Sequence, residues 1–107
     1  MVHIDGSSIL SCIFPLSGVT AKQKIVTLEG LGTPEKPHPV QKAFIEEQAL
    51  QCGYCTNGMI MQSASFLRFH PHPSEGEIRE ALAKNLCRCG SHARIIRAVK
   101  RAAGGQP

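Results

Sequence analysis

The sequence predicts a mainly α fold, in which a small four-helix bundle over residues 40–104 follows a short β segment over residues 1–30. The chain has 107 residues, and 42% of them are hydrophobic, which matches one ordinary globular domain and argues against wholesale disorder. Residues 30–39 hold three Pro and two Gly, a composition typical of a linker, which we place at 31–39. Beyond this linker, apolar residues recur at helical spacing.

The first 30 residues predict short strands. Two runs, 9–14 and 24–28, are β-like, and the second is rich in β-branched residues. Asp5-Gly6 predicts a turn just upstream of them. Two such strands cannot form a stable sheet alone. We therefore expect this segment to be part of something larger, with apolar surface left uncovered.

Four helices are predicted after the linker. The first spans 38–50, and the second, which is apolar nearly all round, spans 56–69. Ser74 and Glu77 match a capping box that starts the third helix, and the fourth spans roughly 92–103. The residues predicted to face inward are Val40, Ala43, Phe44 and Ala49, then Met59, Ile60, Met61, Ala64, Phe66 and Leu67, then Ile78, Ala81, Leu82 and Leu86, and finally Ile95, Ile96, Ala98, Val99 and Ala102.

Composition excludes several classes of protein. No run of 18 apolar residues is present, so we expect no transmembrane segment. The first ten residues carry no basic flank followed by an apolar core, so we expect no secretory signal and a cytoplasmic location, with a periplasmic or membrane-associated complex reached only through a partner. The net charge of +4, without a recognition motif and with 5% aromatics, argues against a nucleic-acid partner.

Five cysteines in so short a chain point to a metal or redox site. Cys52 and Cys55 form C-x2-C, Cys87 and Cys89 form C-x-C, and each pair lies in a turn that leads into a predicted helix. Four thiolates can bind tetrahedral zinc or a [2Fe–2S] cluster. The residues alone leave open an iron–sulfur cluster, a structural zinc site in a helical interaction module, and disulfides or inert thiols.

The residues around these cysteines suit an anionic site. Helix N-termini offer unpaired N–H groups and a partial positive charge. Gly53 and Gly90 let the backbone approach sulfur closely, and Arg88 adds a fixed positive charge. Together with Tyr54, these residues are candidates for tuning the site.

The remaining charged residues have simpler interpretations. Residues 79–107 hold seven Lys or Arg and one acid, which form either a face that docks a partner or a solvated helix face. We favour the solvated face for Arg94, Arg97, Lys100 and Arg101. The five histidines are scattered, so we do not expect a histidine ligand; they are His3, His38, His70, His72 and His92.

Two longer motifs make a family resemblance specific. "QCGYCTNGMIMQSASFL", followed by "IREALAKNLCRCGSHARIIRAVKRAA", resembles the C-terminal iron–sulfur domain of the xanthine oxidase family of molybdenum hydroxylases. The resemblance is to the small-subunit type of nicotinate dehydrogenase and isoquinoline 1-oxidoreductase, and it runs through most of the chain. It implies one [2Fe–2S] cluster held by Cys52, Cys55, Cys87 and Cys89 in a four-helix domain.

The resemblance also implies a role and a partner. The chain would be the non-catalytic iron–sulfur subunit of an oxidoreductase, without catalytic residues of its own. It would carry electrons away from a molybdopterin cofactor on a separate large subunit, in an enzyme that acts on an N-heterocycle or an aldehyde. A further electron-accepting subunit is a second candidate partner. Gln51 and Cys89 would contact the pterin, with Gly53, Arg88 and Gly90 beside the cluster.

The chain departs from the family pattern at its N-terminus. Family members begin with a plant-type ferredoxin domain whose cluster uses C-x4-C-x2-C and a fourth, later Cys. Here "HIDGSSILSCIFPL" matches only the last part of that domain. Residues 1–30 would thus be a C-terminal remnant of a ferredoxin-like [2Fe–2S] domain, and Cys12 the orphan ligand of an incomplete second cluster.

Overall fold

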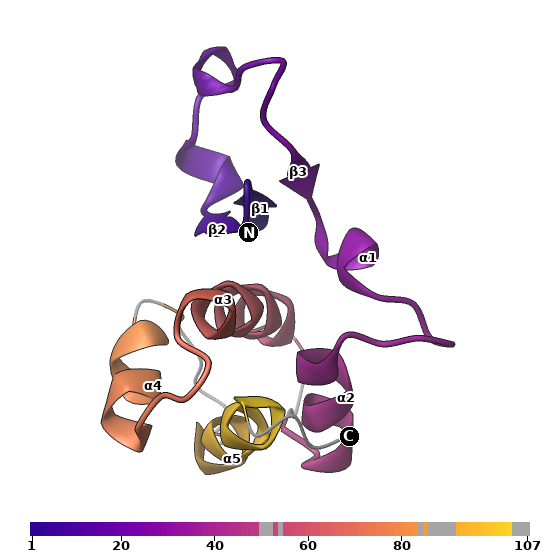
Figure 1. The fold of residues 1–107 in the computed structure, drawn as a ribbon, viewed down its shortest axis with the longest axis vertical. Coiled ribbons are helices and arrows are strands. Elements are labelled where there is room, and N and C mark those ends of the chain that lie inside the picture. Colours follow the sequence, from indigo (N-terminus) through magenta and orange to yellow (C-terminus); the bar gives the residue numbers. More distant parts are fainter. Residues whose placement is uncertain (50–52, 54, 84, 86–91, 104–107) are drawn as a thin grey trace.

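The computed structural model describes residues 1–49, 53, 55–83, 85 and 92–103 (Figure 1). These residues form a helix-rich fold with one small antiparallel sheet. No helix in this part of the chain is long and apolar enough to cross a membrane. The elements, in chain order, are β1 (Val2–Ile4), β2 (Ser7–Ile9), two 3-10 helices (Ser11–Ile13 and Leu16–Gly18), β3 (Ile25–Val26), α1 (Leu28–Leu31), α2 (Pro39–Glu46), α3 (Thr56–Phe69), α4 (Glu75–Ala81) and α5 (His92–Ala103).

The sheet has three strands in the order β2-β1-β3, and both pairings are antiparallel. Asp5 and Gly6 join β1 to β2 with positive φ angles of 51° and 87°, as a two-residue hairpin turn requires. The Asp5 N–H donates to the Lys24 carbonyl (2.9 Å), and the Lys24 N–H donates to Asp5 Oδ1 (2.9 Å). The predicted Asp5-Gly6 turn is confirmed. Through these two hydrogen bonds, Asp5 also holds the residue before β3 beside β1.

The strand predictions were partly wrong. The central strand β1 was not predicted, residues Ser11–Ile13 form a 3-10 helix, and the chain becomes helical at Leu28. The Ile13 N–H donates to the Leu10 carbonyl (3.2 Å), which closes the 3-10 turn. Because β1 has only three residues, the strands that pair with it, β2 and β3, are also short. The β propensity of the sequence extends beyond both of them.

The sheet lies against α3, on the side away from α5 (Figure 1). Ser65 Oγ of α3 donates to the Gly6 carbonyl (2.7 Å) and accepts from the Ser8 N–H (3.1 Å). His3 is buried and its Nε2 donates to the Met61 carbonyl (2.7 Å). Beyond β2 the expected uncovered apolar surface is present, because Ile13 is 75% and Leu16 is 83% exposed.

Helices α2, α3, α4 and α5 surround one apolar core. The predicted spans 56–69 and 92–103 are confirmed by α3 and α5. The capping box is also confirmed, since Ser74 Oγ accepts from the Glu77 N–H (3.3 Å) and Glu77 Oε1 accepts from the Ser74 N–H (2.9 Å). The buried core residues contributed by these helices and by the turn after α2 are Val40, Ala43, Phe44, Ala49, Met59, Ile60, Ala64, Ile78, Ile95, Ile96, Ala98 and Val99.

Two helical features differ from the prediction. The first predicted helix, 38–50, ends at Glu46, because Gln48 adopts a positive φ of 53° and turns the chain back. The short helix α1 (Leu28–Leu31) was not predicted and reaches the first residue of the expected linker. Of the predicted inward-facing residues, Leu86 lies outside the described part of the chain.

Candidate metal centre

The turn after α2 begins the segment that carries the first cysteine pair. The Ala49 N–H donates to the Phe44 carbonyl (3.0 Å) across Gln48, which closes the C-terminal turn of the helix. Ala49 is fully buried, and Arg94 Nη1 of α5 lies 3.5 Å from the Gln48 carbonyl oxygen, to which it donates. The chain therefore leaves α2 next to the first turn of α5.

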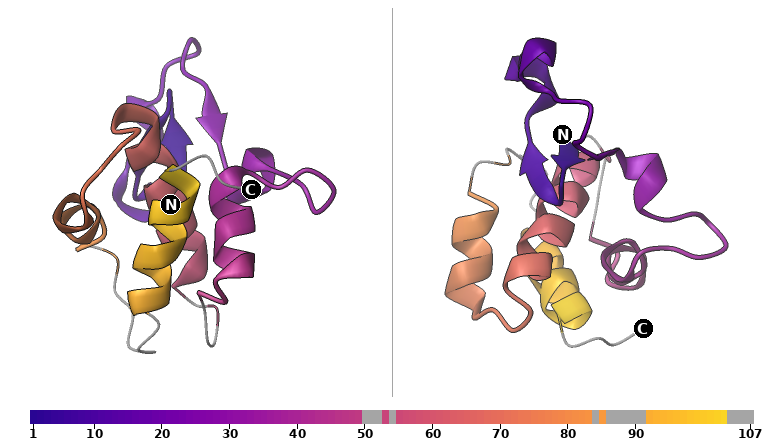
Figure 2. Two further views of the ribbon diagram at one scale, coloured as in Figure 1. Left: turned by 60° about the horizontal axis from the view of Figure 1, so that its bottom comes forward. Right: turned by 45° about the horizontal axis from the view of Figure 1, so that its top comes forward.

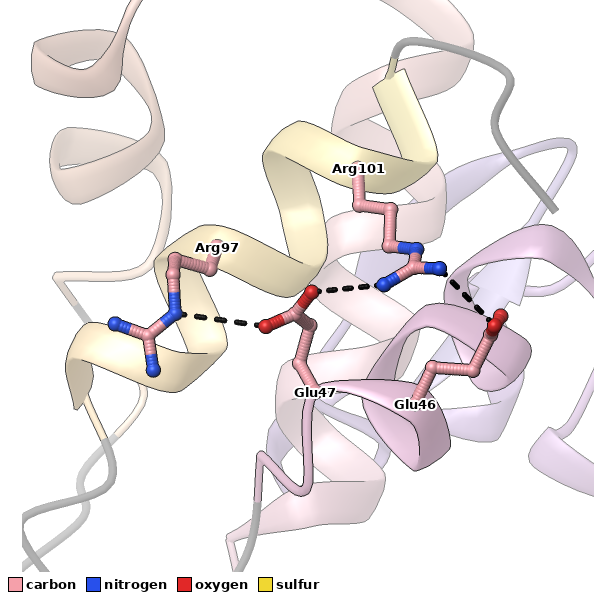
Figure 3. A network of polar contacts seen from close by, with 4 residues as sticks. All are labelled: Glu46, Glu47, Arg97 and Arg101. Carbon is pink, nitrogen blue, oxygen red and sulfur yellow. Dashed lines mark hydrogen bonds and ion pairs between the residues drawn. The ribbon is translucent and has the colours of Figure 1, made fainter.

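An ion-pair network holds α2 against α5 (Figure 3). The Glu47 carboxylate pairs with Arg97 Nε (3.5 Å) and Arg101 Nη1 (3.0 Å), and Arg101 Nη2 also pairs with Glu46 (3.1 Å). Only 34% of the Arg101 side chain is exposed. The prediction of a solvated face is therefore wrong for Arg101, which links the two helices through these carboxylates.

The C-terminal end of α2 and the N-terminal ends of α3 and α5 lie at one end of the helical part, the lower end of the left view in Figure 2. The first cysteine pair falls between α2 and α3, and the second pair precedes α5. The described helix ends that flank the two cysteine pairs, namely the end of α2 and the starts of α3 and α5, therefore lie at the same end of the fold.

Cys55 stands at the start of α3. It is the N-cap residue, its carbonyl accepts from the Met59 N–H (3.0 Å), and it is half-buried against the apolar core. Within the described ranges no side chain caps this helix. The N–H groups and positive dipole end of α3 are thus placed to stabilise a thiolate at Cys55.

Gly53 supplies the backbone geometry that precedes Cys55. Its φ is +88°, and no described heavy atom lies within 4 Å of the position that a Cβ would take. The Thr56 N–H donates to the Gly53 carbonyl (3.3 Å), which fixes this turn to the start of the helix. A side chain would be strained at this φ, so the turn needs glycine.

Two buried oxygen atoms beside the cysteine segments lack a partner among the described residues. They are Thr56 Oγ1, directly after Cys55, and Asn85 Oδ1, two residues before Cys87. A buried polar atom without a hydrogen bond costs about 1–3 kcal/mol. The Thr56 hydroxyl can donate a hydrogen bond to sulfur, so this atom and the start of α3 at Cys55 fit a site completed by a bound group with sulfur ligands.

The sequence analysis did not single out Asn85 or Gly58 as site residues. A Cβ at Gly58, in the first turn of α3, would lie 3.1 Å from Asn85 Nδ2. An isolated glycine inside a helical pattern costs about 1 kcal/mol relative to alanine, and this signal was available in the sequence. Ordinary helix spacing, in contrast, does not reveal which side chain approaches it.

The other predicted site residues have different outcomes. Cys12 is exposed in the 3-10 helix Ser11–Ile13. The residues Gln51, Cys52, Tyr54, Cys87, Arg88, Cys89 and Gly90 lie outside the described residues. In the ranges that are described, three or more His, Cys, Asp or Glu side chains do not gather in a group able to hold a metal ion.

Three histidines have structural contacts. His3 is hydrogen-bonded to α3, as described above. His38 caps α2, with its Nδ1 accepting from the Val40 N–H (3.2 Å), and the His70 ring stacks on Phe66 at a centroid distance of 4.9 Å. Burial, and secondarily the nearby His3, lower the pKa of His38 below its ordinary value, so the neutral ring that the cap needs is favoured.

Comparison with known proteins gives a family and close relatives. A family model described as "[2Fe-2S] binding domain" matches residues 27–100. A nicotinate dehydrogenase subunit from Pseudomonas putida is 58% identical over 102 residues, and the alpha subunit of isoquinoline 1-oxidoreductase from Brevundimonas diminuta is 53% identical. Each alignment covers 95% of this chain, which spans only 64% and 66% of those relatives.

Solved structures agree with this result. The aldehyde oxidoreductase from Desulfovibrio gigas superposes with a TM-score of 0.92 and 34% identity, over 99% of this chain and 12% of that chain. Quinoline 2-oxidoreductase from Pseudomonas putida 86 gives a TM-score of 0.84 and 37% identity, over 99% of this chain and 68% of that chain.

Proposed function

The chain belongs to the family of [2Fe–2S] binding domains, and from this premise we propose that it is the electron-transfer subunit of a molybdopterin-dependent hydroxylase or dehydrogenase. The relatives are named for nicotinate, isoquinoline, quinoline and aldehydes, so the proposed substrate is an N-heterocycle or an aldehyde. The observation that carries the proposal is the family match over 27–100, because this span includes all four clustered cysteines.

We propose Cys52, Cys55, Cys87 and Cys89 as the ligands of one cluster, in a four-helix domain over 40–104. The placement of Cys55 at the start of α3 supports this assignment, as does the position of the end of α2 and the starts of α3 and α5 at one end of the fold. The family match favours an iron–sulfur cluster over the zinc site that the cysteine spacing left open. Residues 1–30 remain proposed as part of a ferredoxin-like domain, with 31–39 as the linker.

A bound [2Fe–2S] cluster supplies one-electron redox chemistry. The chain's own contribution is to hold the thiolates, to limit water by the apolar core around Met59, and to stabilise negative charge with the N-terminus of α3. Gly53, Gly90 and Arg88 are proposed to tune the site. No residue of this chain is assigned to acid–base catalysis.

The substrate reaction therefore belongs to a partner, a large molybdopterin-binding subunit, and Gln51 and Cys89 are proposed to face its pterin. A further electron-accepting subunit is a second proposed partner. We propose a cytoplasmic location, because the cysteines must stay reduced to bind the cluster.

The proposal is tested by loading the chain with ferrous iron and sulfide. We expect two irons per chain, a red-brown colour, and an electron paramagnetic resonance (EPR) signal after reduction with dithionite. Cys55→Ser and the double change Cys87→Ser with Cys89→Ser should each lose most of the iron, whereas Cys12→Ala should leave the iron content unchanged. A colourless protein that binds zinc, or four irons per chain, would contradict the proposal.

A further inference from the structure

A glycine in the first turn of α3 makes room for an asparagine from another segment. Gly58 is half-buried, and glycine inside a helix is about 1 kcal/mol less favourable than alanine. A Cβ at this position would lie 3.1 Å from Asn85 Nδ2, so the neighbouring carboxamide would have to move. The Asn85 carboxamide thus packs closely against Gly58, and a Cβ there would make it shift by a few tenths of an ångström.

Asn85 has a fixed backbone and an unsatisfied side chain. Its N–H donates to the Leu82 carbonyl (3.0 Å), which ties it to the end of α4. Its Oδ1 is buried and has no hydrogen-bond partner among residues 1–49, 53, 55–83, 85 and 92–103. An apolar side chain of similar size would pack there without leaving an acceptor unpaired, so packing alone does not explain the amide.

The contact lies between two residues that are close in sequence to the two cysteine pairs. Gly58 is three residues after Cys55, and Asn85 is two residues before Cys87. Among the described residues, this is where the chain leading to the second cysteine pair meets the helical turn that begins at the first pair. The distance between the Asn85 carboxamide and Gly58 therefore limits how closely the chain at Asn85 approaches the first turn of α3.

We infer that Asn85 is a positioning residue for the cluster: its carboxamide, seated against Gly58, sets the approach of the C-x-C segment to the start of α3. This inference rests on the proposed function. Asn85 is not assigned as a ligand; it acts through Cys87 and Cys89.

The test uses the full 107-residue chain loaded with ferrous iron and sulfide. Asn85→Ala should speed loss of iron to a chelator by about tenfold and change the g-values of the dithionite-reduced cluster. Asn57→Ala is the matched control, because Asn57 is exposed on the same turn of α3, and it should change neither readout. The g-values report the geometry at iron, which a purely stabilising contact elsewhere would leave alone.

Gly58→Ala gives an independent second variant. Alanine favours the helix, so α3 should form at least as well, yet the new Cβ should displace the amide and alter the g-values. In the Asn85→Ala background the same change should have no further effect, because the space is then empty. Circular dichroism checks that both variants keep their helix content.

The outcomes separate the two proposals. If the unaltered chain takes up no two-iron cluster, the proposed function fails and this inference falls with it. If the unaltered chain holds the cluster but Asn85→Ala behaves like Asn57→Ala, only the inference is overturned. Additive effects of Gly58→Ala and Asn85→Ala would also overturn it.

Discussion

Lowering the pH from 7.5 to 5.0 should release the N-terminal cap of α2 and destabilise the fold. His38 Nδ1 accepts a hydrogen bond from the Val40 N–H (3.2 Å), which requires an unprotonated nitrogen. His3 and Arg68 line the same cleft of about 390 Å³, so a proton on His38 would also add positive charge beside them.

The sign follows from the two pKa values of His38. Burial, and to a lesser degree His3, lower the pKa in the folded chain from the ordinary 6.5. The unfolded chain therefore binds the proton first, and the stability conferred by neutral His38 is complete above about pH 6.5 and is lost as the pH falls toward the lower folded value.

The structure limits the size of this loss. The second bond of the capping box, from the His38 N–H to Gln41 Oε1 (2.9 Å), does not use the ring and should survive protonation. One N-cap bond contributes about 1 kcal/mol, so we expect the free energy of unfolding to fall by about 1 kcal/mol. For a domain near 100 residues this corresponds to a decrease of about 4 °C in Tm.

The assay is urea unfolding followed by circular dichroism at both pH values, for the unaltered chain and for His38→Asn. Asparagine caps helices well and does not titrate, while the other four histidines remain in both chains. The difference between the two pH responses thus isolates His38. Equal losses of stability in the two chains would refute the assignment of the pH response to the His38 cap.

Two further predictions concern the end of α2. Glu47→Gln removes the carboxylate shared by Arg97 and Arg101 and should lower the free energy of unfolding by about 1 kcal/mol in low salt. Glu75→Gln, whose partners are well exposed, should lower it by clearly less. Urea unfolding at two salt concentrations checks both changes, and equal losses would count against the network. Gln48→Gly should raise Tm by a few degrees, because glycine adopts the positive φ of 53° without strain; a decrease in Tm would show that the Gln48 side chain stabilises the turn.

The helical half of the fold was largely predictable from local patterns. The bounds of α3 and α5 and the capping box at Ser74 and Glu77 follow from periodicity and from contacts between residues three or four positions apart. The cysteine spacing and flanking motifs identified the family in the same way, because ligand chemistry is recorded in residue type and order. The early end of α2 was missed because a positive φ at a residue such as Gln48 has no clear sequence signal.

The interactions that position the site depend on residues distant in sequence. Glu47 and Arg101 are 54 positions apart, and the pairing of β1 with β3 joins segments separated by more than 20 residues. Asn85 meets Gly58 only because α4 returns the chain to the start of α3. Such contacts form when whole elements pack, and their geometry is set by the shapes of the packed faces. Local sequence therefore specified α3, α5 and the cysteine motif, while tertiary packing brought Asn85 to the first turn of α3 and paired Glu47 with α5.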